Sequence, residues 1–189
     1  MAPTFFYVPS IGLYVARKKK LLGKNWHESH KGLQENREIM LPIPEFVEVL
    51  KYTRENEQEV YRDITEVRSP WRCEWLDADF KFKDSKLYIN SGHRYQGGEL
   101  IPQNSEILAE STLIENKIIS LESWLENPTK QGLPSRKTES GDLCYWSPMR
   151  DNNSVAWFDA DFIGAYFGCS WDPSSRNSVL GVRAAKLEL

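Results

Sequence analysis

The sequence contains no long apolar run, few histidines or cysteines, and no large excess of charge of one sign. Its 189 residues include 3 histidines and 3 cysteines, and 24 basic against 27 acidic residues give a formal net charge of −3. A membrane-spanning helix needs about 20 consecutive apolar residues, so we expect no membrane insertion. A net negative chain has no general basic field for nucleic acid, and we expect no nucleic-acid partner.

The first residues of the chain and its three cysteines indicate which cellular compartment to expect. The first ten residues lack the basic start and long apolar segment of a signal peptide, so the cytoplasm is the default location. Cys73, Cys144 and Cys169 form an odd set without the paired close spacing of a zinc site. A Cys144–Cys169 disulfide is conceivable, but a reducing compartment favours free, partly buried thiols.

Two helices can be placed early in the chain. Asn25 followed by Glu28 has the spacing of a capping box and predicts a helix over 26–36. Pro44 suits a first helical turn, and the apolar residues after it define one face of a helix over 44–55. A chain of this length is expected to form one domain, residues 1–189, whose core needs no disulfide.

Strands are expected on either side of these helices. Residues 1–16 read as one or two strands, 71–82 as a longer one and 87–89 as the start of its hairpin partner. Residues 129–142 read as a long loop, and the chain should end in a strand. The expected class is therefore α+β, with two short helices beside a small twisted antiparallel sheet, long loops and a C-terminal strand.

A six-residue pattern occurs twice, at 75–80 and 157–162, as Trp, an apolar residue, Asp, Ala, Asp and Phe. In a strand, alternate side chains share a face, so each copy has one apolar face and one face that carries Trp and two Asp. Chance similarity of two strands and duplication of a binding element both remain open. We interpret the carboxylates as an exposed face, because the glycine and terminal glutamate of an EF-hand loop are absent.

The histidines do not match a metal motif. His27 and His30 lie three apart on the first predicted helix without a His-Glu-x-x-His pattern. His30 shares a face with Trp26 and is expected to be partly buried, and His93 is a loop residue with no visible partner. No glycine-rich phosphate loop or nucleophile elbow occurs. We therefore expect no metal, no cofactor and no enzymatic activity.

The last forty or so residues concentrate large aromatic side chains among small polar residues and glycines. They are Tyr145, Trp146, Trp157, Phe158, Phe162, Tyr166, Phe167 and Trp171. Rigid aromatics beside Ser, Asn, Asp and Arg are the composition of recognition surfaces. An aromatic-rich core under loops is the alternative interpretation.

Three segments carry a resemblance to a known family: residues 25–46, the run Leu143-Cys144-Tyr145-Trp146-Ser147, and residues 156–186 with Leu180-Gly181-Val182-Arg183 near the close. The chain resembles the C-type lectin-like variable proteins of diversity-generating retroelements, especially the small ones of archaea and their viruses. The fold is shared with formylglycine-generating enzymes. No calcium-ligand motif of calcium-dependent lectins is present in the tail.

The resemblance implies a variable ligand-binding segment, at about 155–183, that recognises a protein or cell-surface ligand. Its implied contact positions are Trp157, Phe158, Ala160, Phe162, Ala165, Phe167, Cys169, Trp171, Ser174, Arg176 and Asn177. Gly164, Gly168, Gly181 and Arg183 are implied to be scaffold. Two alternatives stay open: a thiol-dependent enzyme of the formylglycine type that uses Cys144 and Cys169, and a viral receptor-binding structural component.

Overall fold

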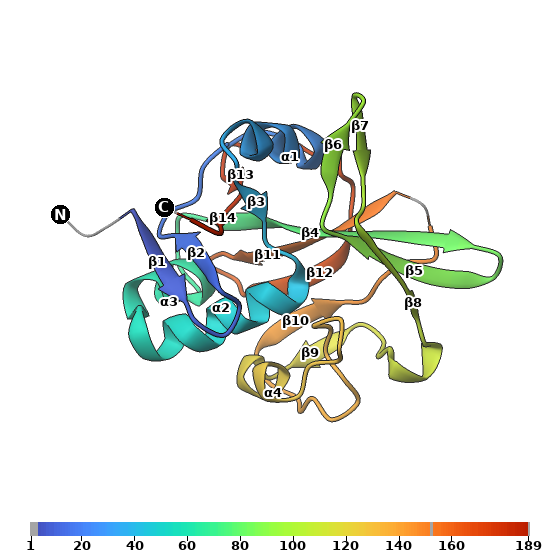
Figure 1. Cartoon of the computed structure of the whole chain (residues 1–189). Helices are drawn as coiled ribbons and strands as arrows, with labels where there is room; N and C mark the ends of the chain where they lie inside the picture. The colour runs from blue at the N-terminus through green and yellow to red at the C-terminus, as the bar shows by residue number, and fades with distance from the viewer. Residues whose placement is uncertain (1–3, 152, 189) are drawn as a thin grey trace.

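The structure is a computed structural model that describes residues 4–151 and 153–188, and its class is α+β as expected (Figure 1). The helices are α1 (Trp26–Glu35), α2 (Ile43–Asn56), α3 (Gln58–Thr65), the 3₁₀ turn η1 (Glu110–Thr112) and α4 (Leu121–Glu126). The strands are β1 (Phe5–Val8), β2 (Leu13–Ala16), β3 (Ile39–Met40), β4 (Arg72–Lys83), β5 (Lys86–Ser91), β6 (Arg94–Gln96), β7 (Glu99–Ile101), β8 (Asn104–Leu108), β9 (Lys117–Ile119), β10 (Leu143–Trp146), β11 (Ser154–Ala160), β12 (Ala165–Trp171), β13 (Leu180–Gly181) and β14 (Ala184–Lys186). No helix in this part of the chain is long and apolar enough to cross a membrane.

The two predicted helices are confirmed, and local chemistry explains where each begins. The Asn25 side chain accepts from the Glu28 backbone N–H while the Glu28 carboxylate accepts from the Asn25 backbone N–H, which completes the capping box of α1. Pro44 lies in the first turn of α2, where its missing N–H costs no hydrogen bond. Residues 60–68 gave no clear prediction, and most of them belong to α3 or the loop after it.

The main sheet is larger than expected and is not purely antiparallel. Its seven-strand path runs β8-β5-β4-β11-β12-β10-β9, and β13 also pairs with β4. The β4–β5 and β11–β12 pairs are hairpins, whereas β10 runs parallel to β12 after the long loop that precedes it. A second sheet, β1-β2-β14-β3, pairs the last strand with the second, so both ends of the chain lie on the same side (Figure 1).

The main sheet separates two apolar cores. One face packs on α2 and α4, where Phe46 and Trp124 contact Phe158, and Trp124 also stacks on Phe167 at 4.4 Å between ring centroids. The opposite face is covered in part by α1 and by the segment that leads into β14. In that second core, the Trp26 indole donates to the Leu76 carbonyl at 2.9 Å. Both faces of β4 are therefore buried, whereas the alternation of apolar and polar residues in its sequence predicts only one buried face.

Burial of both faces corrects the interpretation of the repeated aspartates. Asp77 is 2% exposed and Asp159 is 8% exposed, so neither lies on an exposed strand face. α1 lies over Asp77, and aromatic side chains lie around Asp159. A single strand pattern does not indicate whether its polar face meets water or a second layer.

Candidate recognition surface

Strand alternation divides the residues of β12 between the two faces of the main sheet. Ala165, Phe167 and Cys169 are buried in the core on the helix side. Tyr166 alternates with them and is only partly buried on the opposite face. A register shift after Gly168 brings Trp171 to that same face. The accessible side chains of β12 are therefore Tyr166, Ser170 and Trp171, and only Trp171 is among the contact positions that the resemblance implies.

The same alternation operates in β11. Phe158 and Ala160 lie on the face toward α2 and α4 and are buried, whereas Trp157 and Asp159 lie on the opposite face. Five of the eleven implied contact residues are consequently core residues, and their assignment to a binding surface is corrected: Phe158, Ala160, Ala165, Phe167 and Cys169. The other six are at least partly exposed: Trp157, Phe162, Trp171, Ser174, Arg176 and Asn177.

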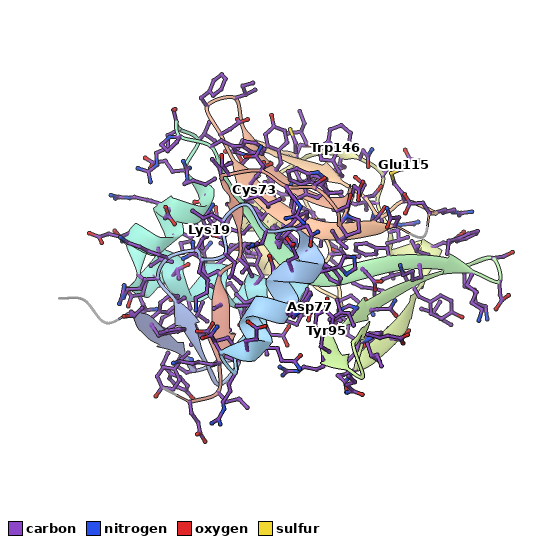
Figure 2. The ribbon with its side chains drawn as sticks, turned by 90° about the horizontal axis from the view of Figure 1, so that it is seen from above. Lys19, Cys73, Asp77, Tyr95, Glu115 and Trp146 are labelled. Carbon is purple, nitrogen blue, oxygen red and sulfur yellow. The ribbon has the colours of Figure 1, made fainter. Side chains whose placement is uncertain are left out.

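The strand registers bring the remaining side chains together in two rows. Trp146 of β10 and Trp157 of β11 are both in register with Gly168 of β12. In the neighbouring row, Cys144 and Asp159 are in register with Tyr166. We call this side of β10, β12 and β11 the open face, defined by Cys144, Trp146, Trp157, Tyr166 and Trp171. Trp146, labelled in Figure 2, is 45% exposed.

Three tryptophans pack together at one edge of the open face, and two of them, Trp71 and Trp157, lie against the buried carboxyl of Asp159. The Trp157 and Trp171 rings meet edge to face at 4.9 Å, and Trp71 stacks on Trp171 at 6.3 Å between centroids. The Trp157 indole N–H donates to the Asp159 carboxyl at 3.3 Å. Burial raises the pKa of Asp159 to about 7, and the Trp157 hydrogen bond opposes this rise. The edge therefore combines aromatic surface with a carboxyl that gains or loses its proton near neutral pH.

The turn between β11 and β12 presents apolar side chains at its tip. Phe162 is 73% exposed and Ile163 is 71% exposed. The Asp161 carboxylate accepts from the backbone N–H groups of Ile163 and Gly164, at 2.6 and 2.9 Å. These bonds hold the turn in shape, so the two apolar residues project from a fixed backbone.

The loop after β12 places polar residues beside the N-terminus of α1. Arg176 lies 2.7 Å from the Glu28 carboxylate, and the Pro173 carbonyl accepts from the Trp26 backbone N–H. The Asn177 side chain accepts from the Val179 backbone N–H at 3.1 Å, which stabilises the loop itself. Ser174 and Arg176 are exposed and extend the surface beyond the strands.

Three of the four implied scaffold residues have clear structural roles. The buried Arg183 guanidinium binds Glu74 at 2.5 Å and also donates to the Ala16 carbonyl at 3.1 Å. A Cβ at Gly181 would lie 2.8 Å from the Lys20 carbonyl oxygen. A Cβ at Gly168 would meet the Trp157 ring at 1.9 Å. Gly164 has no comparably close neighbour.

The three cysteines are free thiols, as expected. Cys169 lies in the core on the helix side, and Cys144 lies on the open face, so the sheet separates them. Burial raises the pKa of the Cys169 and Cys73 thiols well above the usual value. A buried protonated thiol is a poor nucleophile, and this arrangement does not support a mechanism that uses Cys144 and Cys169 together.

A second polar cluster lies under α1, away from the open face. His30 of α1, Asp77 of β4 and His93 of the β5–β6 connection are all buried, and their potential ligand atoms lie within 4.8 Å of one another. The expectation that His93 has no partner is wrong, because its Nδ1 lies 2.5 Å from Asp77 Oδ1. Burial lowers the pKa of His30 to about 4. Sequence spacing could not bring these residues together, since they come from three separate elements.

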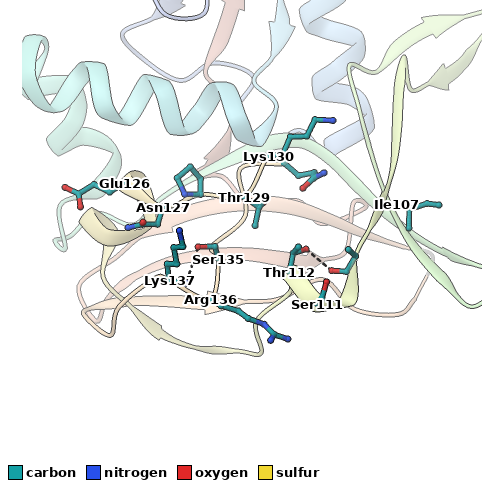
Figure 3. Close-up of a pocket in the computed structure, with 13 residues that line it drawn as sticks. Ile107, Ser111, Thr112, Glu126, Asn127, Thr129, Lys130, Ser135, Arg136 and Lys137 are labelled. Carbon is teal, nitrogen blue, oxygen red and sulfur yellow. Dashed lines mark hydrogen bonds between the residues drawn. The ribbon is translucent and has the colours of Figure 1, made fainter.

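A concave region lies away from both the open face and the buried cluster. A hollow of about 660 Å³ lies between the segment around η1 and the loop that follows α4 (Figure 3). Its lining mixes apolar surface with the basic side chains of Lys130, Arg136 and Lys137. It shares no residue with the open face, and none of its lining residues is among the described residues that carry an unpaired buried polar side-chain atom.

Comparisons with family models, with curated proteins and with solved structures found no match to this chain.

Proposed function

We propose that this chain is a non-catalytic ligand-binding protein that displays a diversified C-terminal surface on a C-type lectin-like scaffold. The proposal joins the resemblance of the tail to the variable proteins of diversity-generating retroelements with the geometry of the open face. The observation that carries it is the separation of roles within the tail. Buried residues such as Phe158 and Phe167 pack against α2 and α4, and the residues that alternate with them lie on the other face of the sheet.

The chemistry of this surface favours a protein or cell-surface ligand. The open face is a sheet surface flanked by a projecting turn and a polar loop, and it offers aromatic rings beside hydroxyl and guanidinium groups. Tryptophan and tyrosine supply contact area at low conformational cost, and Arg176 and Ser174 can supply selectivity. The alternative function, a viral receptor-binding component, would use the same surface. A trimer in solution would favour this alternative.

Matched display libraries test this proposal. One library randomises Phe162, Tyr166, Ser170, Ser174 and Arg176; the control library randomises the five buried residues Phe158, Ala160, Ala165, Phe167 and Cys169. We expect members of the first to reach the yeast surface at parental levels and to yield binders from a panel of cell-surface proteins. We expect members of the control library to be poorly displayed, because core substitutions leave cavities or overpack. Equal loss of display in both libraries, or no binders from the first, would contradict the proposal.

A further inference from the structure

The buried cluster under α1 has the composition and arrangement of a metal centre. His30, Asp77 and His93 are 5%, 2% and 7% exposed. His30 Nε2 has no hydrogen-bond partner although it is buried, and it lies 3.5 Å from Asp77 Oδ1. A buried polar atom without a hydrogen bond destabilises the folded chain, so an unsatisfied imidazole nitrogen beside a carboxylate requires an explanation.

We propose that His30 Nε2, Asp77 Oδ1 and His93 Nδ1 bind a divalent transition-metal ion, with zinc as the best match to their chemistry. Two imidazoles and one carboxylate suit zinc and its first-row neighbours better than calcium or magnesium, which prefer oxygen ligands. This site is independent of the recognition function proposed for the open face.

The distances between the ligand atoms fit this assignment with one small adjustment. Metal–ligand bonds of about 2.0–2.1 Å in a tetrahedral site place ligand atoms about 3.3 Å apart. The separation between His30 Nε2 and Asp77 Oδ1, 3.5 Å, is already close to that value. His93 Nδ1 lies 2.5 Å from Asp77 Oδ1, so the His93 ring must withdraw by about 1 Å and lose the proton shared with the carboxylate.

The surrounding groups are placed as the outer shell of a metal site requires. A ligating histidine usually donates its other ring N–H to a carboxylate, and His93 Nε2 lies 3.5 Å from the buried Asp79 Oδ1. Asp77 Oδ2 accepts from the His93 backbone N–H at 3.1 Å. The Trp26 ring packs edge-on against both imidazoles, at 4.4 and 4.9 Å between centroids, and excludes solvent.

A metal at this point would fasten three elements together. His30 belongs to α1, Asp77 to β4, and His93 precedes the β6–β7 hairpin, which already contacts α1 through Gln34 and Tyr95 at 2.8 Å. Figure 2 shows Asp77 and Tyr95 close to α1. Because the loop with Arg176 rests on the first turn of α1, the ion would also steady the support of the recognition surface.

Metal stoichiometry on the full chain tests the site. The protein is treated with a chelator, incubated with zinc, desalted and analysed by inductively coupled plasma mass spectrometry. We expect one zinc per chain and a higher thermal midpoint than in the chelated protein. His27→Ala is the matched control, since His27 lies one turn earlier on the same helix and is exposed; it should keep the zinc. His30→Ala and Asp77→Asn should lose it, and Asp79→Asn should bind about 10–100-fold more weakly.

Two results would overturn the site. The first is a wild-type chain that retains no zinc, in which case His93 simply bridges the two carboxylates as an imidazolium. The second is zinc that persists in folded His30→Ala, which places the ion elsewhere. If the ligand variants do not fold, X-ray absorption at the zinc edge of the wild type still decides, because the site requires a two-imidazole signature.

Discussion

The Trp157 ring lies directly on the backbone of Gly168, so that a Cβ at Gly168 would fall 1.9 Å from the ring. The two residues face each other across the β11–β12 pairing. Glycine is needed here for close approach rather than for a special backbone angle. This contact fixes a large aromatic side chain of the open face on the scaffold beneath it.

Gly168→Ala should therefore displace Trp157 and lower the free energy of unfolding by about 1–3 kcal/mol, the usual cost of overpacking. Urea unfolding followed by tryptophan fluorescence measures both effects. Gly164→Ala is the control, because its nearest neighbour would be at an ordinary 3.5 Å. In a Trp157→Ala background the cost of Gly168→Ala should disappear. A cost that persists there would show that Trp157 is not the cause.

Arg183 should be a large contributor to stability because Glu74 is buried with it. Arg183→Met leaves the Glu74 carboxylate without its main partner, and removing one member of a buried ion pair costs about 3–5 kcal/mol. Chemical denaturation measures the loss, and replacing Glu74 by Met as well should recover part of it. Arg176→Gln is the matched control at an exposed ion pair and should leave the unfolding midpoint almost unchanged. Equal effects at the two arginines would contradict this account.

Asp159 should make stability depend on pH. Its pKa in the folded chain is raised to about 7 from 3.8, so folding favours the protonated form. The stability that it contributes is complete below about pH 4 and is lost as the pH rises through about 7. Urea midpoints measured from pH 5 to pH 8 should fall more steeply for the wild type than for Asp159→Asn. If the urea midpoints of the two proteins change with pH in the same way, Asp159 is not the group responsible for the pH dependence.

The thiols should differ in reactivity because the sheet separates them. In the native protein Cys144 should react with a maleimide reagent, whereas the buried Cys73 and Cys169 should react only after denaturation. Mass spectrometry counts the adducts, with Cys144→Ser as the control that should give none under native conditions. Rapid native labelling of Cys169 would contradict its placement in the core.

Local signals predicted local structure well. The Asn25 and Glu28 pair located the start of α1, and the proline-led apolar pattern located α2, because both depend on neighbours within one or two turns. The hairpin at β4 and β5 was likewise visible from its alternation and turn residues. The parallel pairing of β10 with β12 was not, since it joins strands whose order is set by the whole sheet.

Of the contact positions predicted in the tail, five lie on the buried face of the sheet and six are at least partly exposed. Phe167 and Tyr166 have similar size and lie next to each other, and only the position of α4 against Phe167 shows which one is core. Strand alternation applied to every contact position would have placed Phe158 and Trp157 on opposite faces, because only one face of each strand lies toward α2 and α4. The His30, Asp77 and His93 cluster had no such signal, as its members are far apart in the sequence.

Sequencing the gene and the few kilobases downstream tests the central claim most directly. A diversified binding protein predicts a near-copy of the segment encoding residues 155–183, differing at adenines and lying beside a reverse transcriptase gene. The differing codons should fall at positions that are at least partly exposed, such as 157, 166, 170, 174 and 176, and should spare Phe158, Phe167, Gly168 and Arg183. The absence of such a repeat, or differences concentrated at those buried positions, would contradict the claim.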